Sequence, residues 1–274
     1  MNRFKFTFIL ASFYAIVLAA SCKKQISSNF TYETSFVNVN SKKLQTYVGG
    51  TGNNTVVFES GLGVDGKTWF TNKIFETIGA GSQVIAYNRA GYTPSTQNGE
   101  PRDLQRLADD LDSVINAKSI NSKVIIVAHS LGGAIARTYA IQHAGKVKAL
   151  LLIDPTHEKF RIYENITQGQ EDTIVQLEIT ANNIGGAIEA AQLIENLTFL
   201  KNLPNLPNIP VTVLTSTKVE GGLSAADIAS WNSAHQSLGA EVTKFTHIRT
   251  NKSGHFIYIE EPQLVIDNIR NLLR

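Results

Sequence analysis

The protein is a chain of 274 residues, of which 43% are apolar and 18% are charged. These proportions are typical of a globular protein and exclude a disordered or collagenous chain, while a single cysteine excludes a scaffold held together by disulfide bonds. The net charge of +2 comes from Arg3 and Lys5, since residues 22–274 hold 23 basic and 23 acidic side chains. This balance gives no sign of a basic surface, so we expect no nucleic-acid partner.

The first 21 residues have the layout of a secretory signal peptide. Arg3 and Lys5 precede an uncharged, mainly apolar stretch from Phe6 to Ser21, which is short for a membrane-spanning helix. Small residues stand directly before Cys22, the only cysteine in the chain. This pattern resembles the processing site of bacterial lipoproteins, which implies cleavage before Cys22 and acylation of its thiol and amino group.

The resemblance predicts an exported protein held at the bacterial cell envelope by lipid on Cys22. The alternative is an ordinary signal peptide with an incidental cysteine, because Ala19 stands where the lipoprotein pattern prefers Leu. Several acyl chains, at about 0.8 kcal/mol for each buried methylene, would make a lasting anchor. Residues 22–30 are mostly polar and lack periodicity, which predicts a tether to a folded body over residues 31–274.

Short runs of β-branched residues alternate with helical patterns along this body, as in βαβ units around a largely parallel sheet. Leu104, Leu107 and Leu111 recur at helical spacing, and a last amphipathic helix starts at about Pro262. The predicted strands are Thr31–Val37, Leu44–Val48, Thr55–Glu59, Gln83–Tyr87, Val124–Ala128, Lys148–Asp154, Val211–Thr215 and Lys244–Arg249.

The alternation stops between about residue 158 and residue 207. This stretch has helical patterns and no convincing strand, and it leads into Pro204, Pro207 and Pro210. Prolines at this density exclude a regular helix or a central strand. We therefore expect a helical insertion that leaves the sheet after one strand, caps the pocket and returns before the next strand.

One strand leads into a sharp turn that carries a serine. The apolar residues 124–128 run into Ser130, a helical pattern follows, and Ala128, Gly132 and Gly133 flank the serine. Small flanking residues are needed where a strained turn from strand to helix brings backbone segments close together. The amino terminus of the helix also places a positive dipole near the serine, where an oxyanion can bind.

Strand, turn and helix context together resemble a serine hydrolase of the α/β-hydrolase family, and the resemblance covers nearly all of residues 31–274. It implies an α/β fold with a mostly parallel, eight-stranded sheet flanked by helices, and Ser130 as the nucleophile. The family usually has glycine at the position of Ala128, and some lipases of the family also carry alanine there. The departure is mild because both residues are small.

The resemblance assigns three further residues. His255 follows the last strand and precedes the last helix, the position of the general base of the triad. The strand ending at residue 59 leads into Ser60, Gly61 and Leu62, where relatives usually have His-Gly. The N–H groups of Leu62 and Leu131 would then form the oxyanion hole. An ordinary glycine turn is the alternative interpretation of residues 60–63.

The acidic member of the triad has three candidates. Relatives usually carry it after the seventh strand, where this chain offers only Glu220 and Asp227. Asp154 ends the sixth strand instead, an arrangement that resembles pancreatic-type lipases. We favour Asp154, with Glu220 or Asp227 as alternatives. Of the remaining five histidines, only His157, at the start of the insertion, is a candidate for lining the pocket.

These roles imply a hydrolase that cleaves a carboxylic ester or related acyl bond of a small molecule through an acyl-enzyme intermediate. The fold also hosts amidases, carbon–carbon hydrolases, acyltransferases and perhydrolases, and a catalytically silent envelope lipoprotein is a further alternative. No cofactor or metal is expected, because the sequence lacks zinc-binding and phosphate-binding motifs. Arg89, in a segment that resembles the Asp-Arg-x-Gly of many relatives, is expected to tie loops together beneath the site.

Overall fold

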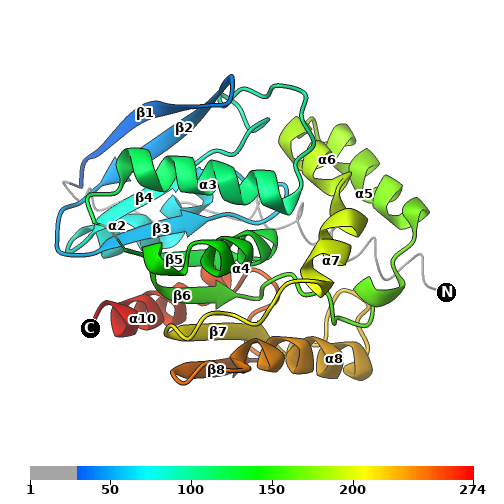
Figure 1. Cartoon of the computed structure of the whole chain (residues 1–274). Helices are drawn as coiled ribbons and strands as arrows, with labels where there is room; N and C mark the ends of the chain where they lie inside the picture. Colours follow the sequence, from blue (N-terminus) through cyan, green and yellow to red (C-terminus); the bar gives the residue numbers. More distant parts are fainter. Residues whose placement is uncertain (1–29, 122) are drawn as a thin grey trace.

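The computed structural model describes residues 30–121 and 123–274 of the chain. The proposed signal peptide, Cys22 and nearly all of the proposed tether lie outside these residues. The fold is built on one sheet with the strand order β1-β2-β4-β3-β5-β6-β7-β8 (Figure 1). The strands are β1 (Tyr32–Val39), β2 (Lys42–Gly49), β3 (Thr55–Glu59), β4 (Gln83–Tyr87), β5 (Val124–His129), β6 (Val147–Ile153), β7 (Val211–Ser216) and β8 (Phe245–Thr250).

The prediction of a mostly parallel, eight-stranded sheet is confirmed. β2 pairs antiparallel with both β1 and β4, and all other neighbouring strands are parallel. Each strand begins and ends within two residues of its predicted bounds. The agreement follows from the continuous apolar runs of the central strands, which are buried on both faces of the sheet.

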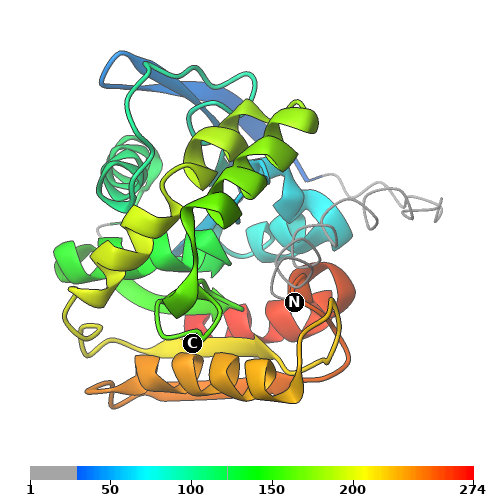
Figure 2. The same ribbon diagram turned by 90° about the vertical axis from the view of Figure 1, so that its right-hand side faces the viewer.

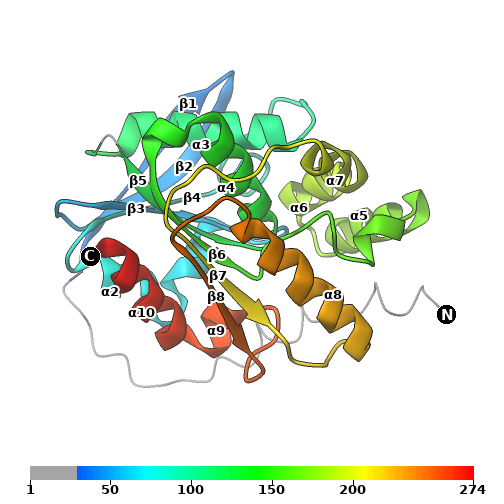
Figure 3. The same cartoon turned by 60° about the horizontal axis from the view of Figure 1, so that its bottom comes forward.

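Helices cover both faces of this sheet. α3 and α4 lie on one face, and α2 and α10 lie on the other (Figures 1 and 3). The α-helices are α2 (Ile74–Gly79), α3 (Leu104–Lys118), α4 (Leu131–Gln142), α5 (Gln168–Thr180), α6 (Ile184–Ala190), α7 (Leu193–Lys201), α8 (Ala225–Gln236), α9 (Ile257–Glu260) and α10 (Pro262–Leu273). No helix in the described part of the chain is long and apolar enough to cross a bilayer.

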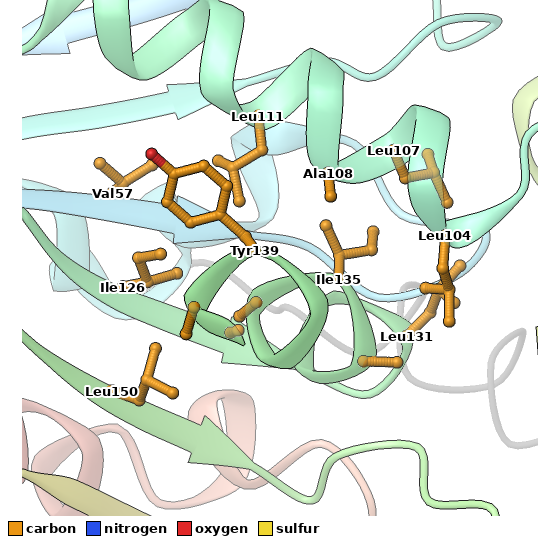
Figure 4. Packing of buried hydrophobic residues seen from close by; sticks show 14 of the residues in the cluster. Val57, Leu104, Leu107, Ala108, Leu111, Ile126, Leu131, Ile135, Tyr139 and Leu150 are labelled. Atoms are coloured by element: carbon orange, nitrogen blue, oxygen red, sulfur yellow. The ribbon is translucent and has the colours of Figure 1, made fainter. Parts of the chain in front are cut away.

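Alternate residues of the central strands supply the two cores. Val57 of β3 and Ile126 of β5 belong to the cluster under α3 and α4 (Figure 4), whereas their neighbours Phe58 and Ile125 belong to the cluster on the opposite face. This is the two-residue period of a strand whose two faces are both buried. The sheet is thereby held on both sides, which gives the loops at its carboxyl edge a rigid base.

The segment between β6 and β7 contains α5, α6 and α7, and none of its described residues form a strand. These helices lie beyond the carboxyl ends of the parallel strands (Figures 1 and 2). We call residues 158–207 the helical insertion. In an open α/β sheet this edge is where ligands bind, so the helical insertion lies over the edge where a site is expected.

Candidate active site

Ser130 stands at the turn between β5 and α4 with a strained backbone. Its φ angle is 54° and its ψ angle is −121°, a conformation that side chains rarely adopt. The turn is fixed because the Ser130 N–H donates to the carbonyl of Ile153, and the Ser130 carbonyl accepts from the N–H groups of Gly133 and Thr156. The strain thus presents the hydroxyl at the end of the sheet.

A hydrogen-bonded chain links Ser130, His255 and Asp154. Nε2 of His255 lies 3.0 Å from Oγ of Ser130, and Nδ1 of His255 lies 2.7 Å from Oδ2 of Asp154. Since a carboxylate only accepts hydrogen bonds, the ring proton belongs on Nδ1, which leaves Nε2 to accept the proton of the serine hydroxyl. This arrangement can convert a serine hydroxyl into a nucleophile.

The environment of Asp154 keeps its carboxylate charged and oriented. Its Oδ1 accepts hydrogen bonds from the Ser216 N–H at 2.9 Å and from Nε1–H of Trp231 at 2.7 Å. Burial raises the pKa of Asp154, but the hydrogen bond and charge of His255, with smaller contributions from His235 and Trp231, bring that pKa below its ordinary value. Asp154 is therefore ionised at neutral pH.

The two alternative acids have other partners. Asp227 caps the amino terminus of α8 through the N–H of Ser224 and lies 3.3 Å from the guanidinium of Arg161. Glu220 forms an ion pair with Lys218 at 2.9 Å. Of the three predicted candidates, Asp154 is the one for which the structure shows a hydrogen bond to the ring of His255.

The turn of residues 60–63 lies against the serine, and we call it the β3 turn. A Cβ on Gly61 would lie 3.2 Å from Cβ of Ser130, and a Cβ on Gly132 would lie 2.5 Å from the carbonyl oxygen of Glu59. Glycines are therefore required for the two turns to approach this closely. Leu131 is the first residue of α4, so its N–H has no acceptor within the helix.

His129 lies behind His255 and stays neutral. Its Nε2–H donates to the carbonyl of His255 at 3.0 Å, and the two rings lie 4.6 Å apart. Burial and the neighbouring His255 lower the pKa of His129 to about 3. A neutral ring in this position supports the loop of His255 without competing for its proton.

His157 does not line the cavity described below. Its Nδ1 accepts the N–H of Lys159, and burial together with the charge of Arg137 lowers the pKa of His157 to about 2. The ring is thus a neutral part of the structure at the start of the helical insertion.

A cavity opens beside Asp154 and His255, between the helical insertion, α8 and the loop of His255. Asp154 and His255 line one wall. Its charged side chains include Lys218, which pairs with both Glu220 and Glu260. Its apolar lining consists of Phe160, Tyr163, Leu223, Ile228, Trp231 and Phe256.

Several residues that hold the site together have no signal in the sequence. Trp231 is 77 positions from Asp154, and no motif connects them. Arg89 was expected to tie loops together, and it binds the carbonyls of Ser60 and Gly61. Its main partner, Glu189 of α6, could not be identified because the two residues are 100 positions apart.

A doubly covered, mostly parallel sheet with a serine at a strained turn from strand to helix defines a protein of the α/β-hydrolase class. The chain belongs to the alpha/beta hydrolase fold family, whose sequence model matches residues 54–201.

The chain is also similar in sequence to individual proteins. The chain is 24% identical to the uncharacterized protein YqjL of Bacillus subtilis over 77% of its own length and 80% of that protein. It is 30% identical to the non-heme chloroperoxidase CPO-A1 of Kitasatospora aureofaciens, over 36% of this chain and 35% of that protein.

Solved structures share the fold. An esterase from Thermogutta terrifontis superposes with a TM-score of 0.67 at 18% identity, over 88% of this chain and 98% of the esterase. A probable hydrolytic enzyme from Pseudomonas aeruginosa gives a TM-score of 0.65 at 15% identity, over 92% of this chain and 96% of that protein.

Proposed function

We propose that this protein is a serine hydrolase that cleaves a carboxylic ester or a related acyl bond. The proposal is carried by one observation, the hydrogen-bonded chain from Ser130 through His255 to Asp154. Ser130 is the nucleophile, His255 the general base and Asp154 the residue that orients and stabilises the imidazolium ring. The N–H groups of Leu62 and Leu131 bind the oxyanion.

The reaction proceeds in two halves. Oγ of Ser130 bonds to the substrate carbonyl carbon while its proton passes to Nε2 of His255, and the carbonyl oxygen becomes an oxyanion. The bond to the leaving group then breaks, and His255 returns the proton to that group. Water repeats the sequence on the acyl-enzyme, which releases the carboxylic acid and restores the Ser130 hydroxyl.

The cavity beside His255 favours a substrate with an uncharged, apolar group. Its wall is largely apolar and aromatic, and the ammonium group of Lys218 is neutralised by Glu220 and Glu260. The leaving group must be next to His255 to receive its proton, so we assign the cavity to the alcohol portion of the ester.

A second candidate function is perhydrolysis, in which hydrogen peroxide instead of water attacks the acyl-enzyme and yields a peracid and the free serine. The observation that favours it is the similarity, at 30 to 31% identity over about 100 residues, to three proteins named as non-heme chloroperoxidases or haloperoxidases. Bromide oxidation in the presence of acetate and hydrogen peroxide would detect the peracid, and its absence removes this candidate.

We also propose that the protein is exported and anchored to the bacterial envelope by lipid on Cys22. The support is the sequence pattern alone: a basic start, an apolar stretch and small residues before the single cysteine. A membrane anchor of this kind would leave residues 31–274 outside the bilayer as the catalytic body.

Labelling with a fluorophosphonate probe tests the hydrolase proposal. The wild-type protein should react covalently, Ser130→Ala should not, and Ser113→Ala, which changes a partly exposed serine of α3, should react normally. Thermal unfolding of each variant establishes that it is folded. A folded wild-type protein that does not react, or a Ser130→Ala variant that reacts equally well, contradicts the proposal and leaves the catalytically silent lipoprotein as the better interpretation.

A further inference from the structure

The β3 turn carries Leu62, the residue whose N–H is proposed to bind the oxyanion. An N–H group stabilises a transition state only if its direction is fixed before the charge develops. The groups that fix this direction therefore matter for the rate. The following inference rests on the proposed function.

Arg89 holds the peptide bond between Gly61 and Leu62. Its guanidinium donates to the carbonyl of Ser60 at 2.6 Å and to the carbonyl of Gly61 at 2.8 Å. In a trans peptide the carbonyl and the following N–H point in opposite directions. Because Arg89 binds the Gly61 carbonyl, it turns the Leu62 N–H away from itself.

Tyr92 holds the next peptide bond of the same turn. The N–H of Gly63 donates to the Tyr92 hydroxyl at 2.8 Å, and this hydroxyl donates to Oε2 of Glu189 at 2.7 Å. Leu62 is therefore fixed on both sides, by Arg89 before it and by Tyr92 after it.

Both of these contacts converge on one carboxylate of the helical insertion. Glu189 of α6 accepts from Nε of Arg89 at 2.6 Å, from Nη2 of Arg89 at 2.8 Å and from the hydroxyl of Tyr92. All three side chains are buried, and Glu189 is only 1% exposed. A second residue of the insertion, Asn183, donates to the carbonyl of Gly63 at 2.7 Å.

Tight packing fixes the position of α6 relative to Arg89 and Tyr92. A Cβ on Gly185 would lie 2.5 Å from the ring of Tyr92, and a Cβ on Gly91 would lie 2.9 Å from Cα of Gly185. The backbone of α6 thus rests directly on the loop of Arg89 and Tyr92. A shift of α6 would carry Glu189 with it.

We infer that Glu189 is a positioning residue for the oxyanion hole, acting on Leu62 through Arg89 and Tyr92. The helical insertion then has two functions: it contributes to the wall of the cavity, and it sets the direction of one of the two N–H groups that bind the oxyanion. Glu189 itself touches no reacting atom.

The test compares three variants with p-nitrophenyl acetate as substrate. Glu189→Gln removes the charge with little change in shape, and Arg89 remains paired with Glu59 at 2.8 Å. Tyr92→Phe removes the acceptor of the Gly63 N–H and leaves the pair of Arg89 and Glu189 in place. Asp110→Asn is the matched control, because Asp110 is an equally buried carboxylate that pairs with Arg102 and Lys42.

We expect kcat to fall by about 10-fold or more in Glu189→Gln and Tyr92→Phe, with KM within about twofold of the wild-type value, since losing an oxyanion donor outright costs about 100- to 1,000-fold. Affinity for a boronic acid, which forms a tetrahedral adduct with the serine, should fall by the same factor as kcat. Asp110→Asn should keep the wild-type kcat and the wild-type affinity for the boronic acid. All variants are measured well below their melting temperatures.

Several results overturn the inference. The inference is wrong if Glu189→Gln and Tyr92→Phe both have the same kcat as the Asp110→Asn control. It is also wrong if these variants lose affinity for the substrate and for the boronic acid to the same extent. If Glu189→Gln does not fold, Tyr92→Phe decides alone. Failure of the proposed function is separate, because the wild-type protein would then not react with a fluorophosphonate.

Discussion

Nδ1 of His255 lies 2.7 Å from Oδ2 of Asp154, a residue 101 positions earlier in the chain. The other oxygen of the same carboxylate accepts from the Ser216 N–H and from Trp231. The carboxylate thus cannot rotate without losing hydrogen bonds, so it holds the imidazole in one orientation and one tautomer. A carboxylate placed after β6 is compatible with this geometry because β6 and β7 are neighbours.

Replacing Asp154 with Asn should lower kcat/KM for p-nitrophenyl acetate by about 10⁴-fold, because an amide does not hold the ring in the required tautomer. Glu220→Gln and Asp227→Asn should stay within a few-fold of the wild-type value, since these side chains form an ion pair and a helix cap. Near-normal activity in Asp154→Asn, or a loss of similar size in Glu220→Gln, would exclude Asp154 as the acid.

The elements of the fold were predictable because their signals are local. Continuous apolar runs mark the buried strands, and the small residues around Ser130 mark the turn. The sequence alone leaves the acid open, because Asp154 follows β6, Glu220 follows β7 and Asp227 lies in the first turn of α8, and β6 and β7 are neighbours in the sheet. Which of them meets His255 depends on the tertiary contacts of Trp231 and Ser216, and these leave no periodic pattern in the chain.

Gly132→Ala should destabilise the protein and slow catalysis. The added Cβ would lie 2.5 Å from the carbonyl oxygen of Glu59, the last residue of β3, and 2.6 Å from that of Ser60, the first residue of the β3 turn. Overpacking of this kind typically costs about 1–3 kcal/mol. Gly145→Ala is the control, because its Cβ meets nothing within 4 Å. Urea unfolding of the two variants measures the difference, and equal stabilities would show that the two turns can separate freely.

Glu178 should make the stability of the protein depend on pH. Burial first, and then the nearby charge of Glu189, raise the pKa of Glu178 to about 7 in the folded state, against an ordinary value of 4.5, and the bond to Asn183 offsets this only in part. Because the pKa of Glu178 is higher in the folded state than in the unfolded state, the stability that Glu178 contributes is fully present below about pH 4.5. That contribution is lost as the pH rises through about 7.

Glu178→Gln, which stays neutral, should therefore gain stability relative to the wild-type protein between pH 5 and pH 8. The expected gain is on the order of 1 kcal/mol once solvent screening is allowed for. Melting temperatures across this range measure it, with the exposed Glu195→Gln of α7 as the control. If the melting temperature of Glu178→Gln differs from that of the wild-type protein by the same amount at pH 5 and at pH 8, Glu178 has an ordinary pKa.

The apolar cavity should make the protein prefer esters of apolar alcohols. Leu223 lines this cavity, whereas Leu177 is exposed on α5. Leu223→Ala should lower the ratio of kcat/KM for benzyl acetate to that for methyl acetate by about 3- to 10-fold, since lost apolar contacts of this size are worth about 1 kcal/mol. Leu177→Ala should leave the ratio unchanged. If this ratio of kcat/KM values is unchanged in Leu223→Ala, the alcohol portion of the ester does not bind in this cavity.

Cys22 should determine where the protein resides. Expressed in a bacterial host, the wild-type protein should sediment with membranes and give a mature mass above that of residues 22–274 by the mass of its acyl groups. Cys22→Ala should lose both properties, because the thiol that accepts the lipid is gone. Ala19→Leu brings the sequence closer to the lipoprotein pattern and should be processed at least as completely as the wild-type chain. Mass spectrometry of the amino-terminal peptide decides, and an unmodified Cys22, or cleavage at another bond, would rule out the lipid anchor.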